Sequence, residues 1–334
     1  MLDPDDIRIE ERPLPPLEPG DLLVRTAACG VCSGDLMPWY VRRKAPFVFG
    51  HEPAGTVVAA GDGARFNVGD RVFAHHHAPC FACAFCAAGD YVQCATWRAT
   101  KLDPGGMAEY FRVPRANVAD TLALPASLSF VDASLVEPLA CVVKSLRRAA
   151  AGGLGGRTVY VVGLGAMGLM HVALAVRMGA RVVGSDFVAA RRDAAQRLGA
   201  EAAVDPGGAV AALGDLTGGR GPDAVICAPG TAPALAHALE AAAPGGTVVM
   251  FSPLEPGEPF AFDQGAAYFR DLTLTGSYSC GPDDTAEALG LLADGALSAA
   301  GLGARLYPFP AVAEAYEAAR SGREIKAIVT FPDE

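Results

Sequence analysis

The chain has 334 residues, of which 51% are hydrophobic and 19% are charged, so it is long enough for two domains with ordinary buried cores. Its formal net charge of -10 argues against a nucleic-acid partner, because affinity for a phosphate backbone depends on concentrated Lys and Arg. The acidic start contains no apolar run, and arginines and glycines interrupt the longest apolar stretch, residues 158–184. We therefore expect a cytoplasmic protein without a secretory signal or a membrane span.

The first third of the chain carries short Val-, Gly- and Pro-rich segments. Strands are expected near residues 21–26 and 55–60, in an antiparallel domain rich in loops. From about Val131 the pattern changes to short apolar runs that alternate with Ala-rich helical segments. We predict strands near 158–162, 181–184, 224–227, 247–251 and 272–276, and helices near 166–178, 188–198 and 232–243. Such alternation indicates an α/β domain with a parallel sheet covered on both faces. A helix near 285–294 and a strand near 326–331 are expected to follow.

A glycine motif follows directly on the strand expected at 158–162. Gly163, Gly165 and Gly168 have the G-x-G-x-x-G spacing, with Ala166 and Met167 between the last two. This motif permits a tight turn, a close approach of a pyrophosphate and close packing of the helix on the sheet. The free N–H groups of the helix N-terminus then face the phosphates. The run therefore predicts a dinucleotide site.

Asp186 ends the next predicted strand, at the position where a carboxylate binds the ribose hydroxyls. This favours NAD, because the 2′-phosphate of NADP would meet a negative charge. Arg191 and Arg192 come shortly afterwards and offer two interpretations: ligands of a 2′-phosphate, or a solvated helix face. We favour the second.

Four cysteines lie within 15 residues: Cys80, Cys83, Cys86 and Cys94. Four thiolates at this spacing can close a tetrahedral shell around one zinc ion, which leaves no position for a substrate and therefore indicates a structural site. A [4Fe–4S] cluster is the chemical alternative, because it also uses four thiolates. Nothing nearby suggests electron transfer, so zinc is preferred.

Further metal-ligand residue types are scattered along the chain. Cys29 and Cys32 form a C-x2-C pair, His51-Glu52 follows a glycine, and Glu137 opens a Glu-Pro-Leu segment. Cys, His and carboxylate ligands suit a zinc site that keeps one position open. Taken singly, however, these residues favour a buried histidine and ordinary buried thiols, because no spacing rule connects positions so far apart.

In this order along nearly the whole chain, the motifs resemble those of the zinc-containing medium-chain dehydrogenase/reductase family. The motifs are Gly30-Val31-Cys32 with Asp35, Gly50-His51-Glu52, the four cysteines, and the glycine motif with Asp186. The Glu-Pro-Leu segment at residues 137–139 is most similar to the sorbitol- and threonine-dehydrogenase branches.

The resemblance implies a GroES-like, mostly-β catalytic domain and a Rossmann domain with a doubly wound parallel sheet. The catalytic domain is expected at 1–131, with the structural-zinc lobe near 79–96, and at 282–334, and the NAD-binding domain at 132–281. The given start is either truncated or lacks a short edge strand that the family usually has.

The resemblance also implies that Cys32 and His51 bind a catalytic zinc, with Glu52, Glu137 or a water in the remaining places. Cys29 matches no family ligand and is expected to be a buried thiol. Lys326 matches a basic residue that approaches the pyrophosphate, the alternative being a surface lysine. The implied protein is a homotetramer or homodimer that binds one NAD and two zinc ions per chain.

The chain departs from the family in its proton relay. Gly34 stands where the family has a hydroxyl residue, and Met37 stands where many members have a histidine. Ser33, Glu52, Glu137, a water or a histidine of the run 75–77 is expected to substitute.

The function predicted on this basis is hydride transfer between NAD and a small alcohol, polyol or hydroxy amino acid. Two alternatives stay open. A reductase of an iminium or activated alkene needs no alcohol-proton relay, and a non-catalytic nucleotide-binding protein would keep only the fold.

Overall fold

The computed structural model describes residues 1–150 and 152–332, and the chain divides into two compact units. Unit 1 comprises Met1–Ala140 and Cys280–Glu334, and unit 2 comprises Cys141–Ser279, inserted in the chain between the two segments of unit 1. These limits lie close to the domain limits expected at 131/132 and 281/282. The last two residues of the predicted second catalytic segment lie outside the described residues.

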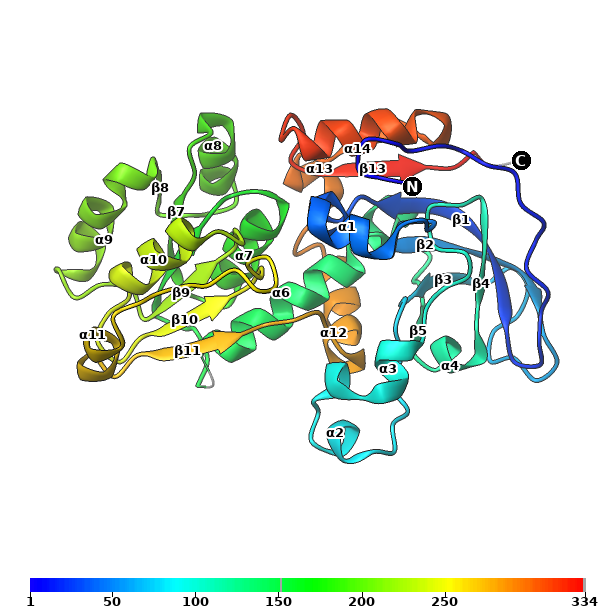
Figure 1. Ribbon diagram of the computed structural model, residues 1–334, viewed down its shortest axis with the longest axis horizontal. Coiled ribbons are helices and arrows are strands. Elements are labelled where there is room, and N and C mark those ends of the chain that lie inside the picture. The colour runs from blue at the N-terminus through cyan, green and yellow to red at the C-terminus, as the bar shows by residue number, and fades with distance from the viewer. Residues whose placement is uncertain (151, 333–334) are drawn as a thin grey trace. The chain divides into compact units, whose positions relative to one another are not determined.

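Unit 1 is built on a seven-stranded sheet of order β12-β13-β1-β2-β3-β5, with β4 paired to β1 (Figure 1). The strands pair antiparallel except β12 and β13, which are parallel. Their bounds are β1 Leu22–Gly30, β2 Pro53–Ala60, β3 Arg71–Ala74, β4 Tyr110–Val113, β5 Thr121–Ala123, β12 Arg305–Pro308 and β13 Ala327–Thr330. Apolar side chains that alternate along β1 and β4, among them Val24 and Phe111, fill a core beneath this sheet.

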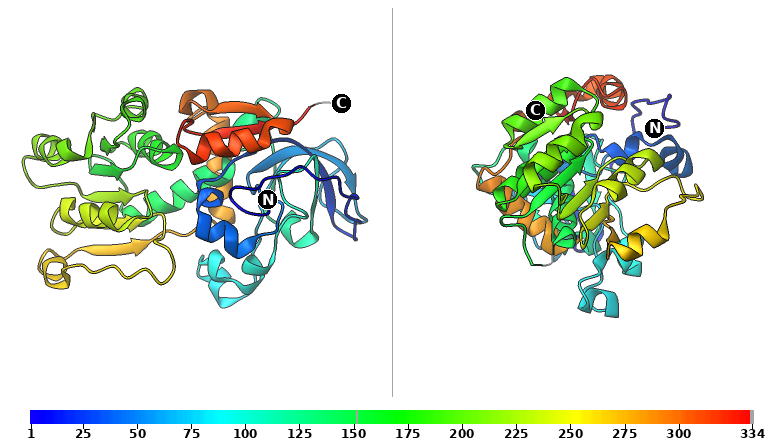
Figure 2. Two further views of the ribbon diagram at one scale, coloured as in Figure 1. Left: turned by 45° about the horizontal axis from the view of Figure 1, so that its top comes forward. Right: turned by 90° about the vertical axis from the view of Figure 1, so that its left-hand side faces the viewer.

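Short helices connect and cover the strands of unit 1. They are η1 Ser33–Leu36, α1 Pro38–Lys44, α2 Ala84–Ala87, η2 Tyr91–Gln93, α3 Ala95–Ala99, α4 Arg115–Val118, α5 Phe130–Ala133, α12 Pro282–Ala293, α13 Ala299–Leu302, η4 Phe309–Ala311 and α14 Val312–Arg320. Helix α14 buries Val312 and Tyr316 in a second core with Val329 of β13. The lobe that carries α2 extends away from the sheet of unit 1 in all the views of Figures 1 and 2.

Unit 2 contains a six-stranded, all-parallel sheet of order β11-β10-β9-β6-β7-β8, the strand order of a Rossmann fold. Its strands are β6 Thr158–Val162, β7 Arg181–Ser185, β8 Ala202–Val204, β9 Ala224–Cys227, β10 Thr247–Met250 and β11 Thr273–Gly276. Its helices are α7 Ala166–Arg177, α8 Ala189–Arg197, η3 Pro206–Gly208, α9 Ala209–Thr217, α10 Ala232–Ala241 and α11 Gln264–Phe269, and α6 Val136–Ala149 enters it from unit 1. The predicted fold class, a GroES-like domain with a Rossmann domain, is confirmed.

The sequence patterns locate most strands of unit 2 to within a residue or two, but they miss β8 and the helices α6, α9 and α11. Strand β8 consists of Ala-Ala-Val, which has little β propensity of its own, and it is recruited by pairing with β7. Helix α12 starts at Pro282, before the predicted residue 285. Proline fits the first helical turn, and Asp284 accepts a hydrogen bond from the N–H of Gly281 at 2.9 Å. Within the described part of the chain, no helix combines the length and apolarity that a bilayer crossing requires.

Candidate active site and metal centres

Strand register in unit 1 brings the predicted ligands together. Because Cys29 of β1 pairs with Pro53 of β2, the segment just after β1 lies beside the segment just before β2. The first of these segments carries Cys32 and the second carries His51 and Glu52. Ligand atoms of Cys32, His51 and Glu52 all lie within 4.8 Å of one another. The structure thus brings Cys32 to the neighbouring pair His51 and Glu52, which no sequence spacing rule connects to it.

Asp35 holds the histidine of this group. Its buried carboxylate, 1% exposed, lies 3.3 Å from Nδ1 of His51. A carboxylate at one ring nitrogen is the usual second partner of a metal-binding histidine, because it fixes the tautomer and ring orientation. Burial opposes the charged ring, yet Asp35 and Cys32 raise the pKa of His51 well above its ordinary value. The surroundings of this ring therefore attract a positive charge, as a metal site requires.

Glu52 is held by a buried lysine. Oε2 of Glu52 accepts a hydrogen bond from Nζ of Lys326 at 2.5 Å, and the same ammonium donates to the carbonyl of Val31 at 3.0 Å. Lys326 is 3% exposed, so it is not the surface lysine of the alternative interpretation. Its ammonium is engaged inside unit 1, and its predicted role at a pyrophosphate stays a prediction. Oε1 of Glu52 is buried without a hydrogen-bond partner among the described residues, which fits a metal ligand.

Gly30 makes room for this ion pair. A Cβ at Gly30 would lie 1.8 Å from Oε2 of Glu52 and 3.0 Å from Cε of Lys326. The sequence reasoning used Gly30 only as part of a motif and did not identify this role. The signal available in the sequence was a glycine two residues before a predicted metal ligand, because glycine lets another group approach the backbone closely.

The three histidines of the run 75–77 each have different neighbours. Nδ1 of His75 lies 2.6 Å from Asp120, and Nδ1 of His77 lies 2.6 Å from the carbonyl of Thr100. The ring of His76 lies edge-on to that of His75 and tilted against that of His77, and its centroid is 4.7 Å from that of His51. Ligand atoms of His75, His76 and Glu137 form a further group within 4.8 Å, and Glu137 does not belong to the group of Cys32.

Of the other predicted relay residues, Ser33 lies in η1 and is exposed. Gly34 donates its backbone N–H to Sγ of Cys32 at 3.3 Å, which orients the thiolate. The position that lacks a hydroxyl therefore still contributes to the site through its backbone.

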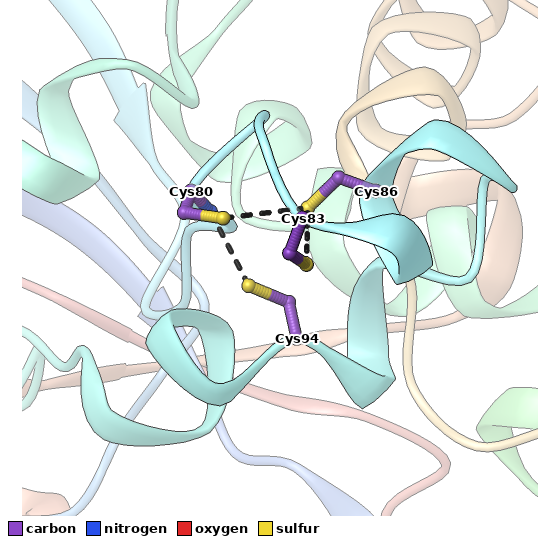
Figure 3. A group of neighbouring side chains, drawn as sticks. All are labelled: Cys80, Cys83, Cys86 and Cys94. Atoms are coloured by element: carbon purple, nitrogen blue, oxygen red, sulfur yellow. Dashed lines mark hydrogen bonds between the residues drawn. The ribbon is translucent and has the colours of Figure 1, made fainter.

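The four cysteines of the lobe converge, as Figure 3 shows. Sγ of Cys83 lies 3.5 Å from Sγ of Cys86, and Sγ of Cys80 lies 3.9 Å from the same atom. Sulfur atoms on a tetrahedral zinc at 2.3 Å are about 3.8 Å apart, so the spacing suits zinc. Burial raises the pKa of Cys94, but hydrogen bonds from backbone N–H groups, among them that of Cys80, lower it to about 6. This favours the thiolate that a metal needs.

The glycine motif of unit 2 adopts the predicted strand–turn–helix form between β6 and α7. Gly163 has φ +82°, and a Cβ at Gly168 would lie 1.9 Å from the carbonyl oxygen of Gly163. Gly165 caps α7, whose first residues are Ala166 and Met167. Nothing lies within 4 Å of a Cβ at Gly165, so this turn leaves space for a phosphate.

Asp186 ties the end of β7 to this turn. Its carboxylate accepts hydrogen bonds from the backbone N–H of Leu164 and of Val188, both at 2.8 Å. Arg191 lies 3.5 Å from the same carboxylate, and Arg192 donates to the carbonyl of Asp186 at 2.8 Å. Arg192 is thus engaged with backbone, while the guanidinium of Arg191 lies beside the carboxylate of Asp186.

A Rossmann unit with this turn, a four-cysteine cluster and a Cys-His-Glu group define a zinc-binding dehydrogenase that uses a nicotinamide cofactor. Comparison with known proteins agrees. Residues 18–125 match the alcohol dehydrogenase GroES-like domain, and residues 166–294 match the zinc-binding dehydrogenase domain. D-xylulose reductase A of Aspergillus niger is 30% identical over 98% of this chain and 94% of its own length.

Two solved structures are similar over almost the whole chain. An alcohol dehydrogenase from Thermus sp. ATN1 is 27% identical with a TM-score of 0.87, over 99% of this chain and 98% of its own. A Sinorhizobium meliloti protein described as a zinc-binding dehydrogenase, with NADP bound, is 29% identical with a TM-score of 0.86, over 98% of this chain and 97% of its own. The chain belongs to the zinc-containing medium-chain alcohol/polyol dehydrogenase family, and it is an oxidoreductase of alcohols or polyols.

Proposed function

We propose that this enzyme oxidises a polyol or small secondary alcohol with NAD, using a zinc ion held by Cys32, His51 and Glu52. The observation that carries the proposal is the convergence of these three ligands within 4.8 Å in unit 1. The polyol class is supported by the similarity to D-xylulose reductase A. Because the chain belongs to this family, we also propose that it forms a homotetramer or homodimer. Analytical ultracentrifugation would test this.

Each residue of the site has a distinct task in this proposal. A zinc ion held there would supply Lewis acidity, and a bound nicotinamide cofactor would supply the hydride acceptor. Asp35 keeps Nδ1 of His51 occupied, so that Nε2 is the metal ligand. Lys326 holds one oxygen of Glu52 and leaves the other, Oε1, for the metal.

His76 is the proposed replacement for the missing proton relay. Its ring lies beside His51, and its buried Nδ1 has no hydrogen-bond partner in the described part of the chain. Burial and the neighbouring His77 lower its pKa well below the ordinary value, so the ring is held neutral, and a proton that it takes up would be passed on rather than retained. The other two histidines of the run are already engaged, by Asp120 and by Thr100.

NAD is the proposed cofactor because the carboxylate of Asp186 lies at the turn that would receive the adenosine ribose. The NADP of the Sinorhizobium meliloti relative shows that the same fold also binds the phosphorylated nucleotide. If NADP competed with NAD for this site, Arg191, near Asp186, would be the residue that binds its 2′-phosphate.

The test is a substrate screen of polyols and secondary alcohols with NAD and with NADP, run beside zinc analysis of the wild type and Cys32→Ala. We expect NAD-linked turnover in the wild type, and in the variant no turnover and one zinc fewer per chain. NADH consumption with iminium or alkene substrates, and none with alcohols, would replace the proposal by the relay-free reductase. If the wild type and Cys32→Ala contained equal amounts of zinc, the assignment of a zinc site to Cys32 would be wrong.

A further inference from the structure

Four aromatic side chains of unit 1 form a continuous series that begins at the Cys32 site. The ring centroid of His51 lies 4.7 Å from that of His76, and the ring of His76 lies 4.1 Å from that of His77. The ring of His77 lies 4.1 Å from that of Trp97. The planes of successive rings are tilted by 43°, 47° and 36°, so that each ring packs against the next.

The far end of this aromatic series lies inside the cysteine lobe. Trp97 belongs to α3 and is 1% exposed. It packs with Cys86, Val92 and Cys94, and the two cysteines are predicted ligands of the lobe zinc. The series therefore connects the core of the lobe to the histidine of the Cys32 group.

Thr100 connects the middle of the series to the lobe. Its carbonyl accepts a hydrogen bond from Nδ1 of His77 at 2.6 Å, and its Oγ1 accepts one from the backbone N–H of Ala78 at 2.9 Å. Thr100 is also the C-cap of α3, the helix that carries Trp97. A movement of α3 would therefore be transmitted to His77, because the ring cannot leave Trp97 without loss of these hydrogen bonds.

The backbone makes the contact between the two successive histidines possible. Along a continuous strand, neighbouring side chains point to opposite faces, but the chain bends at His76, shortly after β3. Burial and the neighbouring His75 lower the pKa of His77 to about 3, so its ring is uncharged at neutral pH. His77 thus offers His76 a flat, neutral ring to pack against.

We propose that Trp97 and His77 are positioning residues, through which the cysteine lobe holds the ring of His76 against His51. This coupling rests on the function proposed above, in which His76 replaces the missing proton relay. Loosening of the lobe should then slow turnover at the Cys32 site, to which Trp97 contributes no ligand. Filling of the Cys32 site should in turn alter the surroundings of Trp97, since coupling between two binding sites is reciprocal.

The first experiment measures kcat and KM for NAD-linked turnover in His77→Ala, His77→Phe and the control His237→Ala. His237 is a partly buried histidine of unit 2 that contacts Tyr160, and its variant should match the wild type. His77→Ala removes the ring that supports His76 and should lower kcat about 10–100-fold with little change in KM. Phenylalanine keeps a flat ring but carries no proton, so His77→Phe should recover most of the lost kcat.

Two kinetic results would contradict the proposal. A normal kcat in His77→Ala would show that the ring of His77 supports nothing that turnover requires. An equal loss of kcat in His77→Ala and His77→Phe would make His77 a carrier of protons rather than a positioning residue.

The second experiment requires no turnover. In Trp39→Phe, Trp97 is the single remaining tryptophan, and its emission is recorded while zinc is added to the metal-free protein. Binding of the zinc ion that Cys32→Ala fails to bind should change this emission. The change should be lost in His77→Ala and retained in His77→Phe. An emission that does not respond to this ion would overturn the coupling. If Cys32→Ala binds as much zinc as its parent, the proposed function fails instead, so the two failures are distinguishable.

Discussion

The cysteine lobe and the Cys32 site illustrate two ways of building a metal centre. The lobe takes all its ligands from 15 consecutive residues, and its helices α2 and α3 have five residues or fewer. The Cys32 group takes its ligands from the segments just after β1 and just before β2, and its supports from η1 and from Lys326, the residue before β13. We infer that the metal organises the lobe, whereas the fold organises the Cys32 site before any metal binds.

The largest expected effect is local, in the lobe. Cys94→Ser should remove the lobe zinc and with it about 10 kcal/mol of apparent metal-binding free energy, so that the lobe loses its order. Trp97 packs against Cys94 and Cys86, and its fluorescence should shift to the red as it becomes solvated. The matched control Cys29→Ser should change neither zinc content nor fluorescence. An unchanged Trp97 spectrum after zinc loss would mean that the lobe is organised without metal.

The next largest effect is expected at the Cys32 site. Cys32→Ala should lower kcat at least about 1000-fold, because several kcal/mol of Lewis-acid stabilisation are lost. Its melting temperature should stay close to that of the wild type, since the fold holds this site. Nucleotide binding by unit 2 should persist in a fluorescence titration. A collapse of stability equal to that of Cys94→Ser would show that both centres depend on metal for their structure.

A third prediction concerns the ion pair that supports the Cys32 group. Lys326→Met leaves the buried carboxylate of Glu52 without its cation and should destabilise the protein by about 3–5 kcal/mol in urea unfolding. The exposed Lys101→Met provides the control and should change stability by about 0.5 kcal/mol or less. Equal stabilities of the two variants would contradict the view that the fold alone maintains this site.

The smallest expected effect lies in unit 2. Asp186→Ser should shift the ratio of kcat/KM for NADP and NAD at least about tenfold towards NADP, because a negative charge is removed where the 2′-phosphate would lie. Asp193→Ser, exposed on α8, is the matched control and should leave the ratio unchanged. A ratio that does not respond to Asp186 would assign cofactor choice to other residues.

Local sequence determined the features whose residues are close together in the chain. The segment from Gly163 to Gly168 predicts a nucleotide-binding turn, because backbone conformation is a local property. The four cysteines predict a metal site, because their spacing alone permits a tetrahedral shell. The strand–helix alternation of unit 2 was predictable for the same reason, except where Ala-rich β8 depends on its partner strand.

Only the tertiary structure decided how distant residues combine. Pairing of β1 with β2 and β13 joins Cys32, His51, Glu52 and Lys326, and pairing of β3 with β5 joins His75 to Asp120. Sequence gave no sign of the Glu52–Lys326 pair or of Cys280 beside His75, because strand register and the burial of charge are properties of long-range pairing that no single segment contains.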